Sequence, residues 1–154
     1  MHRPQSLPLC SSSVWTVDEI SSYLKVTTIP VRLGCIDQEG FPLVCSLWYL
    51  YRDGHIWCAV HKNSKVSKLL SYNPKCAFEI APNEAPYRGV RGQGMANLLR
   101  DEASNVLPEL IDRFMGDKNP TLKKWLLSRV DQEFAIRIDM TWLTSWDFSE
   151  RMQG

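Results

Sequence analysis

The sequence predicts a mainly β protein of the α+β class, in which six or seven antiparallel strands curl into a small barrel and helices flank it. Apolar, strand-like runs follow one another between turn signals from Ile29 to Ile80. Helical patterns are grouped between residues 102 and 130 instead of alternating with strands, which favours an antiparallel sheet. Closing such a sheet into a barrel removes its exposed edges.

The composition is that of one globular domain, which we expect to span residues 1–154. Hydrophobic residues make up 44% of the chain and charged residues 23%. The net charge of +1 provides no field that would draw the protein onto nucleic acid or an anionic membrane. No apolar run approaches the roughly 20 residues that span a bilayer, and prolines interrupt the amino terminus where a signal peptide would be apolar. We therefore expect a cytoplasmic protein.

The cysteines are odd in number and never form Cys-x-x-Cys. Most of them lie inside apolar runs, which predicts small buried thiols in a reducing compartment instead of disulfides or a zinc site. With only three histidines in the chain, no metal site is expected. The five positions are Cys10, Cys35, Cys45, Cys58 and Cys76.

The amino-terminal third begins with a predicted loose arm over residues 1–13, which are rich in proline and serine. A short helix is expected in "TVDEISSYLKV", where Thr16 and Glu19 fit a capping box and an apolar stripe recurs at helical spacing. Three strands follow, "IPVRLGCID", "FPLVCSLWYLY" and "HIWCAV", joined by the turns "DQEG" and "RDG". This pattern predicts a β-meander.

The second of these strands carries large apolar groups on both faces. One face carries Val44, Ser46, Trp48 and Leu50. The other face carries every second residue from Leu43 to Tyr51. We expect one face to fill the barrel and the other to pack on a helix or another subunit. Neither face is expected to be solvated.

The second half of the chain resumes with a helix from about Ser64 to Tyr72, stopped before Pro74. "KCAFEIA" then returns to the sheet, and "GVRGQGMANLLR" predicts a long strand whose glycines at 89, 92 and 94 indicate bulges or close backbone approach. Helices are expected at about 102–115 and 120–130, separated by "GDKN". Two closing strands are predicted in "EFAIRID" and "TWLTSWDF".

Three lysines stand where a strand turns into a helix, in "HKNSKVSKLLSYNP". A helix that starts at Asn63 or Ser64 presents unpaired N–H groups and a positive dipole end. Lys62 and Lys65 are unfavourable there for the helix alone, so a bound anion such as phosphate would resolve the conflict. The alternative is that Lys62, Lys65 and Lys68 form a solvated face.

Four segments in order resemble the pyridoxamine 5′-phosphate oxidase-like superfamily, the flavin-nucleotide-binding split barrels. The likeness spans about Ile29 to Phe148. The segments are "GFPLVCSLWYLYRDGHIWCAV", "HKNSKVSKLLSYNPKCAFEI", "PYRGVRGQGMANLL" and "FAIRIDMTWLTSWDF". The resemblance implies a split β-barrel homodimer that holds FMN, or in some branches the deazaflavin F420, in a groove between subunits.

The resemblance also implies site residues. Val44, Ser46 and Trp48 would line the flavin ring, and Trp57 to His61 would continue the groove. Lys62, Ser64 and Lys65 would bind the phosphate, in agreement with the charge argument. The partner subunit would complete the ring site with residues whose alternative role is core or dimer packing: Tyr87, Arg88, Arg91 and Trp146.

The implied function is an FMN-dependent oxidoreductase that passes hydride or electrons to an unknown small substrate. His61 and Tyr49 are candidate proton donors, although a hydrogen-bonded histidine and a buried tyrosine are the favoured explanation for these two residues. The alternatives are a non-catalytic flavin-binding or sensor protein, an F420-dependent reductase, and a cofactor-free interaction domain. The chain lacks the arginine- and histidine-bearing carboxy-terminal segment of true pyridoxamine phosphate oxidases, so vitamin B6 oxidation is not expected.

Overall fold

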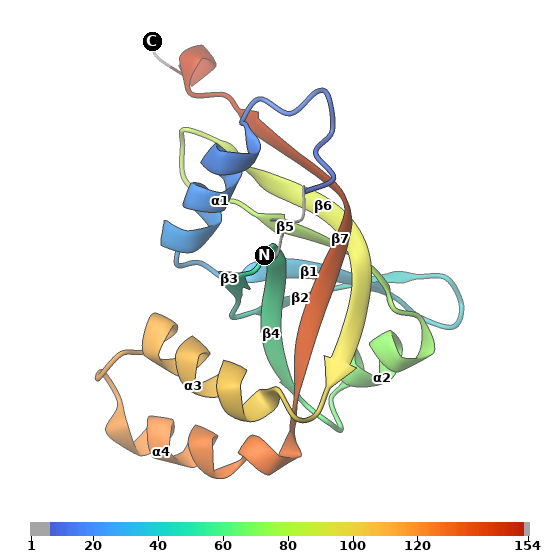
Figure 1. The fold of residues 1–154 in the computed structure, drawn as a ribbon, viewed down its shortest axis with the longest axis vertical. Helices are drawn as coiled ribbons and strands as arrows, with labels where there is room; N and C mark the ends of the chain where they lie inside the picture. Colours follow the sequence, from blue (N-terminus) through green and yellow to red (C-terminus); the bar gives the residue numbers. More distant parts are fainter. Residues whose placement is uncertain (1–6, 153–154) are drawn as a thin grey trace, which may run out of the picture.

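A computed structural model describes residues 7–152 of the chain. One seven-stranded antiparallel sheet in the order β2-β1-β5-β6-β7-β4-β3 curls around the core, and the predicted mainly β fold is confirmed (Figure 1). The strands are β1 (Val31–Ile36), β2 (Pro42–Leu47), β3 (Leu50–Arg52), β4 (His55–His61), β5 (Lys75–Ile80), β6 (Arg88–Leu99) and β7 (Glu133–Asp147). The helices are α1 (Val17–Val26), α2 (Lys65–Tyr72), α3 (Ala103–Phe114) and α4 (Pro120–Ser128), with short 3-10 turns η1 (Val130–Gln132) and η2 (Glu150–Met152).

The predicted strand "FPLVCSLWYLY" is two strands at opposite edges of the sheet. β2 pairs with β1, whereas β3 pairs with β4, so the chain crosses between the edges at Trp48 and Tyr49. Tyr49 explains the break, because its ring is fully buried and its hydroxyl lies 2.8 Å from the carbonyl oxygens of Leu24 and Thr27. The prediction of a continuous meander was therefore wrong at this point.

The exposed face of β2 also differs from the prediction. Val44 is 70% exposed in the single chain and Ser46 is exposed as well, so no helix of the same chain covers this face. We expected either a helix or another subunit to cover this face, so another subunit is the remaining candidate.

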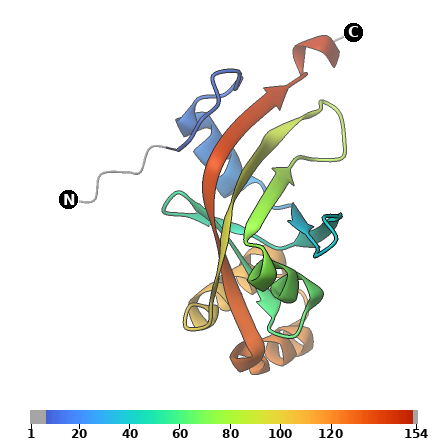
Figure 2. The ribbon, with the colours of Figure 1, turned by 90° about the vertical axis from the view of Figure 1, so that its right-hand side faces the viewer.

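β6 and β7 are the longest strands and run side by side along the molecule, with α3 and α4 at one end (Figures 1 and 2). The two closing strands predicted from sequence are a single strand, β7. Its register against β6 shifts between Gln93 and Gly94, where Met140 and Trp142 are the partners and Thr141 is left over. This bulge interrupts the apolar pattern and explains why the strand looked like two.

The glycines of β6 allow close approach of the backbone, as predicted. A Cβ at Gly92 would lie 2.5 Å from Cζ of Phe78 and 2.6 Å from the carbonyl oxygen of Trp142. A Cβ at Gly94 would lie 2.6 Å from the carbonyl oxygen of Asp139. A side chain therefore fits at neither position unless the sheet shifts.

Gly92→Ala is expected to lower the free energy of unfolding by about 1–3 kcal/mol, the usual cost of overpacking. Urea unfolding would measure it. Gly34→Ala in β1 is the matched control, because the nearest atom to its Cβ is at an ordinary 3.6 Å; it should stay within about 1 kcal/mol of the unsubstituted protein. Equal losses in both variants would contradict the packing argument.

Helices α1 and α3 close the barrel from the side. Thr16 caps α1 by accepting from the amide of Glu19, as the capping-box pattern predicts. Ile20 and Leu24 of α1 enter the main core. Arg113 of α3 donates to the carbonyl oxygens of Leu24, Lys25 and Thr27, at the end of α1 where unpaired carbonyls collect. The two helices are thereby joined.

The predicted loose arm is ordered in its described part. Leu9 bridges Leu143 in parallel, Cys10 donates its amide to the carbonyl of Leu143, and Ser13 shares a hydrogen bond with Ser145. Residues 7–13 therefore lie along β7, beyond the point where β4 ends its pairing. The first part of the predicted arm, residues 1–6, lies outside the described residues.

Candidate functional site

The N-terminus of α2 follows the last residue of β4 after a tight turn. Ser64 caps the helix, because its Oγ accepts from the amide of Ser67 at 3.1 Å. The amides of Lys65 and Val66 have no hydrogen-bond partner among residues 7–152. The first turn also contains no acidic residue. The terminus thus offers two free N–H groups and an uncompensated positive dipole end.

His61 organises the turn before α2. Its Nδ1 accepts from the amide of Asn63 at 3.0 Å, and its carbonyl accepts from the amide of Ser64 at 2.9 Å. In the neutral ring the proton therefore sits on Nε2. Burial raises the pKa of Glu133, the cross-strand neighbour of His61, although the charges of His61 and Arg129 oppose the shift.

Lys62, Lys65 and Lys68 form no ion pair with any described residue. Lys62 is partly exposed, and Lys65 and Lys68 are exposed. The structure thus brings Lys62, Ser64 and Lys65 together at one helix end, as predicted, and places Lys68 one turn further along.

A second feature is a hollow on the outer face of the sheet, which we call the sheet groove. It has a volume of about 470 Å³. Small residues line its floor: Gly34 and Ala77, which pair across β1 and β5, and Gly92 of β6. A neighbouring hollow of about 530 Å³ shares Gly34 and Ala77 with it. The residues that line the sheet groove include Arg32, Gly34, Val44, Ala77, Glu79, Arg91 and Gln93.

Polar and charged side chains form one row across the strands of the sheet groove. The register places Ser46, Arg32, Glu79 and Arg91 side by side on β2, β1, β5 and β6. Arg32 donates to Oγ of Ser46 at 3.0 Å. The guanidinium of Arg91 lies 4.5 Å from the ring centroid of Trp146, a cation–π distance. The groove therefore combines a small-residue floor with two arginines.

The sequence-predicted ring residues separate into two groups. Val44 and Arg91 line the sheet groove, and Ser46 is adjacent through Arg32. Trp48 instead stacks on Phe114 of α3, with ring centroids 5.5 Å apart and an interplanar angle of 9°. It packs against the smaller core cluster between α3, β3 and β4.

The remaining predicted partner-site residues lie near the start of β6. Arg88 and Tyr87 are exposed, and Arg88 is the cross-strand partner of Asp147. Trp146 is half-buried beneath Arg91 and would be 3.0 Å from a Cβ at Gly89. Packing thus accounts for part of the Trp146 surface.

Tyr49 cannot serve as a proton donor to a ligand. Its side chain is fully buried, and its hydroxyl is already engaged by the carbonyls of Leu24 and Thr27. Burial raises the pKa of Tyr49 to about 12. Of the two candidate proton donors, only His61 reaches a partly exposed position.

The groove residues that sequence reasoning missed include Arg32, Gly34, Ala77 and Gln93. One signal was available: alternation in "IPVRLGCID" places Arg32 and Gly34 on the same face of a strand. The side-by-side placement of β1 and β5, which are separated by three strands and a helix in the chain, was not visible in the pattern.

The five cysteines are all free thiols. Among residues 7–152, no three histidine, cysteine or acidic side chains gather closely enough to hold a metal ion. None of the helices in this part of the chain has the length and apolar character needed to cross a bilayer.

No family model matches the chain, and no curated protein matches it in sequence. Solved structures do match its fold. A conserved hypothetical protein of Mycobacterium tuberculosis is 21% identical with a TM-score of 0.79, over 95% of this chain and 93% of that one. An F420 reductase is 18% identical with a TM-score of 0.65, over 80% and 94% of the two chains. A Listeria innocua protein assigned as a pyridoxamine 5′-phosphate oxidase is 14% identical with a TM-score of 0.57, over 86% and 97%.

The chain has the split-barrel fold of pyridoxamine 5′-phosphate oxidase-like proteins. The resemblance inferred from four sequence segments is thereby confirmed at the level of the fold. In this split barrel, the chain crosses from one edge strand, β2, to the other, β3, at Trp48 and Tyr49. The sheet groove lies on the β2 side of this crossing.

Proposed function

We propose that the protein is an FMN-binding oxidoreductase that transfers hydride or electrons through the flavin to a small substrate. The observation that carries the proposal is the N-terminus of α2. It combines two free amides with two lysines that have no ion-pair partner among the described residues. A phosphate monoester would satisfy all of these groups at once.

The donor set at α2 fits the phosphate of FMN. The amides of Lys65 and Val66 point out of the helix end, and Ser64 Oγ accepts from Ser67 while its own proton is free to be donated. Lys62 and Lys65 add two ammonium groups. Helices favour anions at this end, and no carboxylate in the first turn competes with the ligand.

We place the flavin ring in the sheet groove, between two copies of the chain. Phe41 and Val44 are 67% and 70% exposed and Met95 is 38% exposed, an apolar surface that a second subunit would cover. Val44 and Ser46 would then line the ring from one subunit. Arg91 lines the same groove as Val44, so it would reach the ring from that subunit. Arg88 and Trp146 are proposed to approach the ring from the partner, and Trp48 to support the site through its stack on Phe114.

The isoalloxazine supplies the redox chemistry by accepting or donating hydride. The residues of the chain bind and orient it, and the second subunit excludes water from the groove. His61 is the residue we propose to hold a proton near the site, on Nε2, because Nδ1 is occupied by the amide of Asn63. Since the five cysteines are free thiols, we keep the cytoplasm as the proposed location.

The visible absorption spectrum of the purified protein, repeated after addition of FMN, tests the proposal. Bands near ~370 and ~450 nm that co-elute with the protein are the expected result. A colourless protein that does not retain added FMN or F420 would overturn the proposal and leave a cofactor-free interaction domain. Reduction of the bound flavin by NADH or NADPH and its reoxidation would separate an enzyme from a non-catalytic flavin-binding or sensor protein.

An F420-dependent reductase is the second candidate. Arg32 and Arg91 both line the sheet groove and Lys75 lines the neighbouring hollow, so a longer acidic tail would find cations along it. F420 in place of FMN would give a single band near ~420 nm. Competition between the two cofactors for the same protein would rank them.

A further inference from the structure

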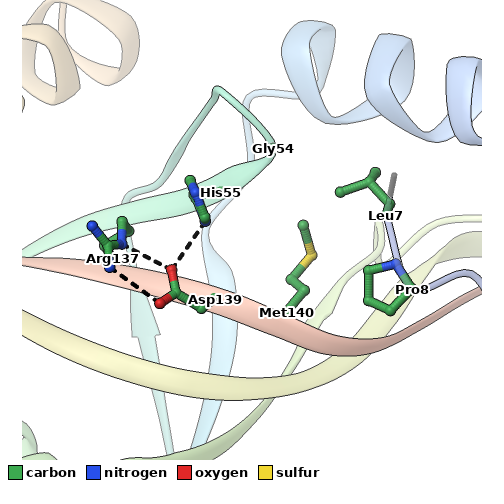
Figure 3. A pocket seen from close by; sticks show the side chains of 7 residues that line it. All are labelled: Leu7, Pro8, Gly54, His55, Arg137, Asp139 and Met140. Atoms are coloured by element: carbon green, nitrogen blue, oxygen red, sulfur yellow. Dashed lines mark hydrogen bonds and ion pairs between the residues drawn. The ribbon is translucent and has the colours of Figure 1, made fainter. Parts of the chain in front are cut away.

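A third cavity lies away from the sheet groove and from α2. It has a volume of about 380 Å³ and opens beside β7, between the first residue of β4 and the amino-terminal segment that runs along β7. Figure 3 shows that its lining divides in two. Leu7, Pro8 and Met140 form an apolar side, and His55, Arg137 and Asp139 form a polar side.

The carboxylate of Asp139 accepts three hydrogen bonds from described residues. Its Oδ1 accepts from Nε of Arg137 at 2.8 Å, and its Oδ2 accepts from Nη2 of Arg137 at 3.1 Å and from Nδ2 of Asn97 at 2.8 Å. Burial pushes the pKa of Asp139 up, but the hydrogen bond and charge of Arg137, with smaller help from His55 and Asn97, outweigh it and hold the pKa below its usual range. The carboxylate is therefore ionised and has little capacity left for a cation.

Asp139 sets the proton position on His55. Nδ1 of His55 lies 3.1 Å from Oδ1 of Asp139, but off the line of a hydrogen bond, and it has no hydrogen-bond partner among residues 7–152. The negative charge of the carboxylate at this distance favours a proton on Nδ1 over a lone pair there. Nδ1 is buried while the side chain as a whole is 21% exposed, so its exposed surface belongs to its other atoms. With the proton on Nδ1, Nε2 is the acceptor of the neutral ring, and His55 is one of the residues that line the cavity.

Arg137 retains donors for a second anion. The guanidinium has five N–H groups, and the two bonds to Asp139 are the only hydrogen bonds it makes within the described chain. Its side chain is 34% exposed, so the remaining N–H groups are open to a ligand. Planar N–H pairs of this kind suit a carboxylate.

We propose that this cavity binds a small 2-hydroxy carboxylate, with the carboxylate on Arg137 and the hydroxyl donated to Nε2 of His55. The short aliphatic part of such an acid would contact Leu7, Pro8 and Met140. The volume is at the lower end of the range for small-molecule sites. The site shares no lining residue with the sheet groove, so the proposal stands apart from flavin binding.

Lactate is the probe, and the amide resonances of Gly54 and Met140 in ¹⁵N-labelled protein report on the cavity that both residues line. We expect saturable shifts with a dissociation constant on the order of 1 mM. Propionate lacks the hydroxyl and should bind up to about tenfold more weakly, the value of one hydrogen bond. Propane-1,2-diol lacks the carboxylate and should cause no saturable shift.

The variant His55→Phe separates this site from non-specific anion binding. Lactate should lose its advantage over propionate, so that the two bind equally, while binding of propionate to Arg137 persists. Asp139 keeps Arg137 and Asn97 as partners in this variant, so no charge is left unpaired. His55→Val repeats the test with a smaller side chain if the phenylalanine variant does not fold.

Three outcomes would overturn the proposal. The first is the absence of saturable shifts at Gly54 and Met140 up to about 50 mM lactate. The second is equal binding of lactate and propionate by the unsubstituted protein. The third is a lactate advantage that survives in His55→Phe. Lys118→Ala, at an exposed lysine in the turn before α4, is the matched control and should bind lactate as the unsubstituted protein does.

Discussion

The double substitution Lys62→Ala and Lys65→Ala is expected to weaken FMN binding by at least a hundredfold. Two charge-assisted contacts to phosphate contribute about 3 kcal/mol or more, and each 1.4 kcal/mol is about a factor of ten in affinity. The same change removes two cations from the positive end of α2, so the free energy of unfolding should not fall. Quenching of FMN fluorescence on titration with protein measures the affinity, and urea unfolding measures the stability.

The control for this experiment removes the same charge elsewhere. Lys118 and Lys124 are exposed at the α3–α4 end of the molecule, and their replacement by alanine changes the net charge equally. FMN affinity should stay within about twofold in this variant, because only screened, long-range charge is lost. Equal losses in both double variants, or no loss in the first, would show that α2 does not hold the phosphate.

If the proposed dimer forms through the sheet groove, Val44→Lys is expected to convert it into a monomer and to abolish flavin binding with it. Val44 is 70% exposed in the single chain, so the substitution should change the chain's own stability by no more than about 0.5 kcal/mol. In a twofold interface the substitution occurs twice, beside Arg32 and Arg91 of the sheet groove. Burying unpaired lysines costs several kcal/mol, enough to raise the dimer dissociation constant more than a hundredfold.

Light scattering after size-exclusion chromatography would measure the mass. Val26→Lys is the matched control, because this valine is 77% exposed but lies at the end of α1, outside the sheet groove. It should leave both mass and FMN affinity unchanged. A Val44→Lys protein with unaltered mass would place the interface, if any, on another face.

Local chemistry made much of the fold predictable. Thr16 was a recognisable helix cap, and its hydroxyl oxygen accepts from the amide that the capping pattern requires. Pro74 marked the end of α2, and the glycines of β6 indicated the close approach that Gly92 makes to Phe78. Each of these depends on a few neighbouring residues, so sequence pattern is enough to identify it.

Non-local placement was harder to predict. Nothing in the run "FPLVCSLWYLY" shows that the chain changes edges at Tyr49, because the partner groups are carbonyls of Leu24 and Thr27 in a different element. For the same reason Trp48 looked like a neighbour of Val44, whereas its ring stacks on Phe114 of α3. The position of the lysines at the start of α2 was predictable because helix and charges are adjacent in the chain. The sheet groove was not, because it needs the order of the strands.

The order of the strands also bears on how the protein is made. β7 lies between β6 and β4, so the β3–β4 hairpin is hydrogen-bonded to the rest of the sheet only through the last strand to leave the ribosome. At usual rates of synthesis the hairpin waits roughly five to fifteen seconds for this partner. α3 is synthesised during that interval, before β7, and in the finished protein it packs on Leu50 and Trp57 of the hairpin. The inserted helix can therefore shield the nascent hairpin from aggregation until β7 arrives.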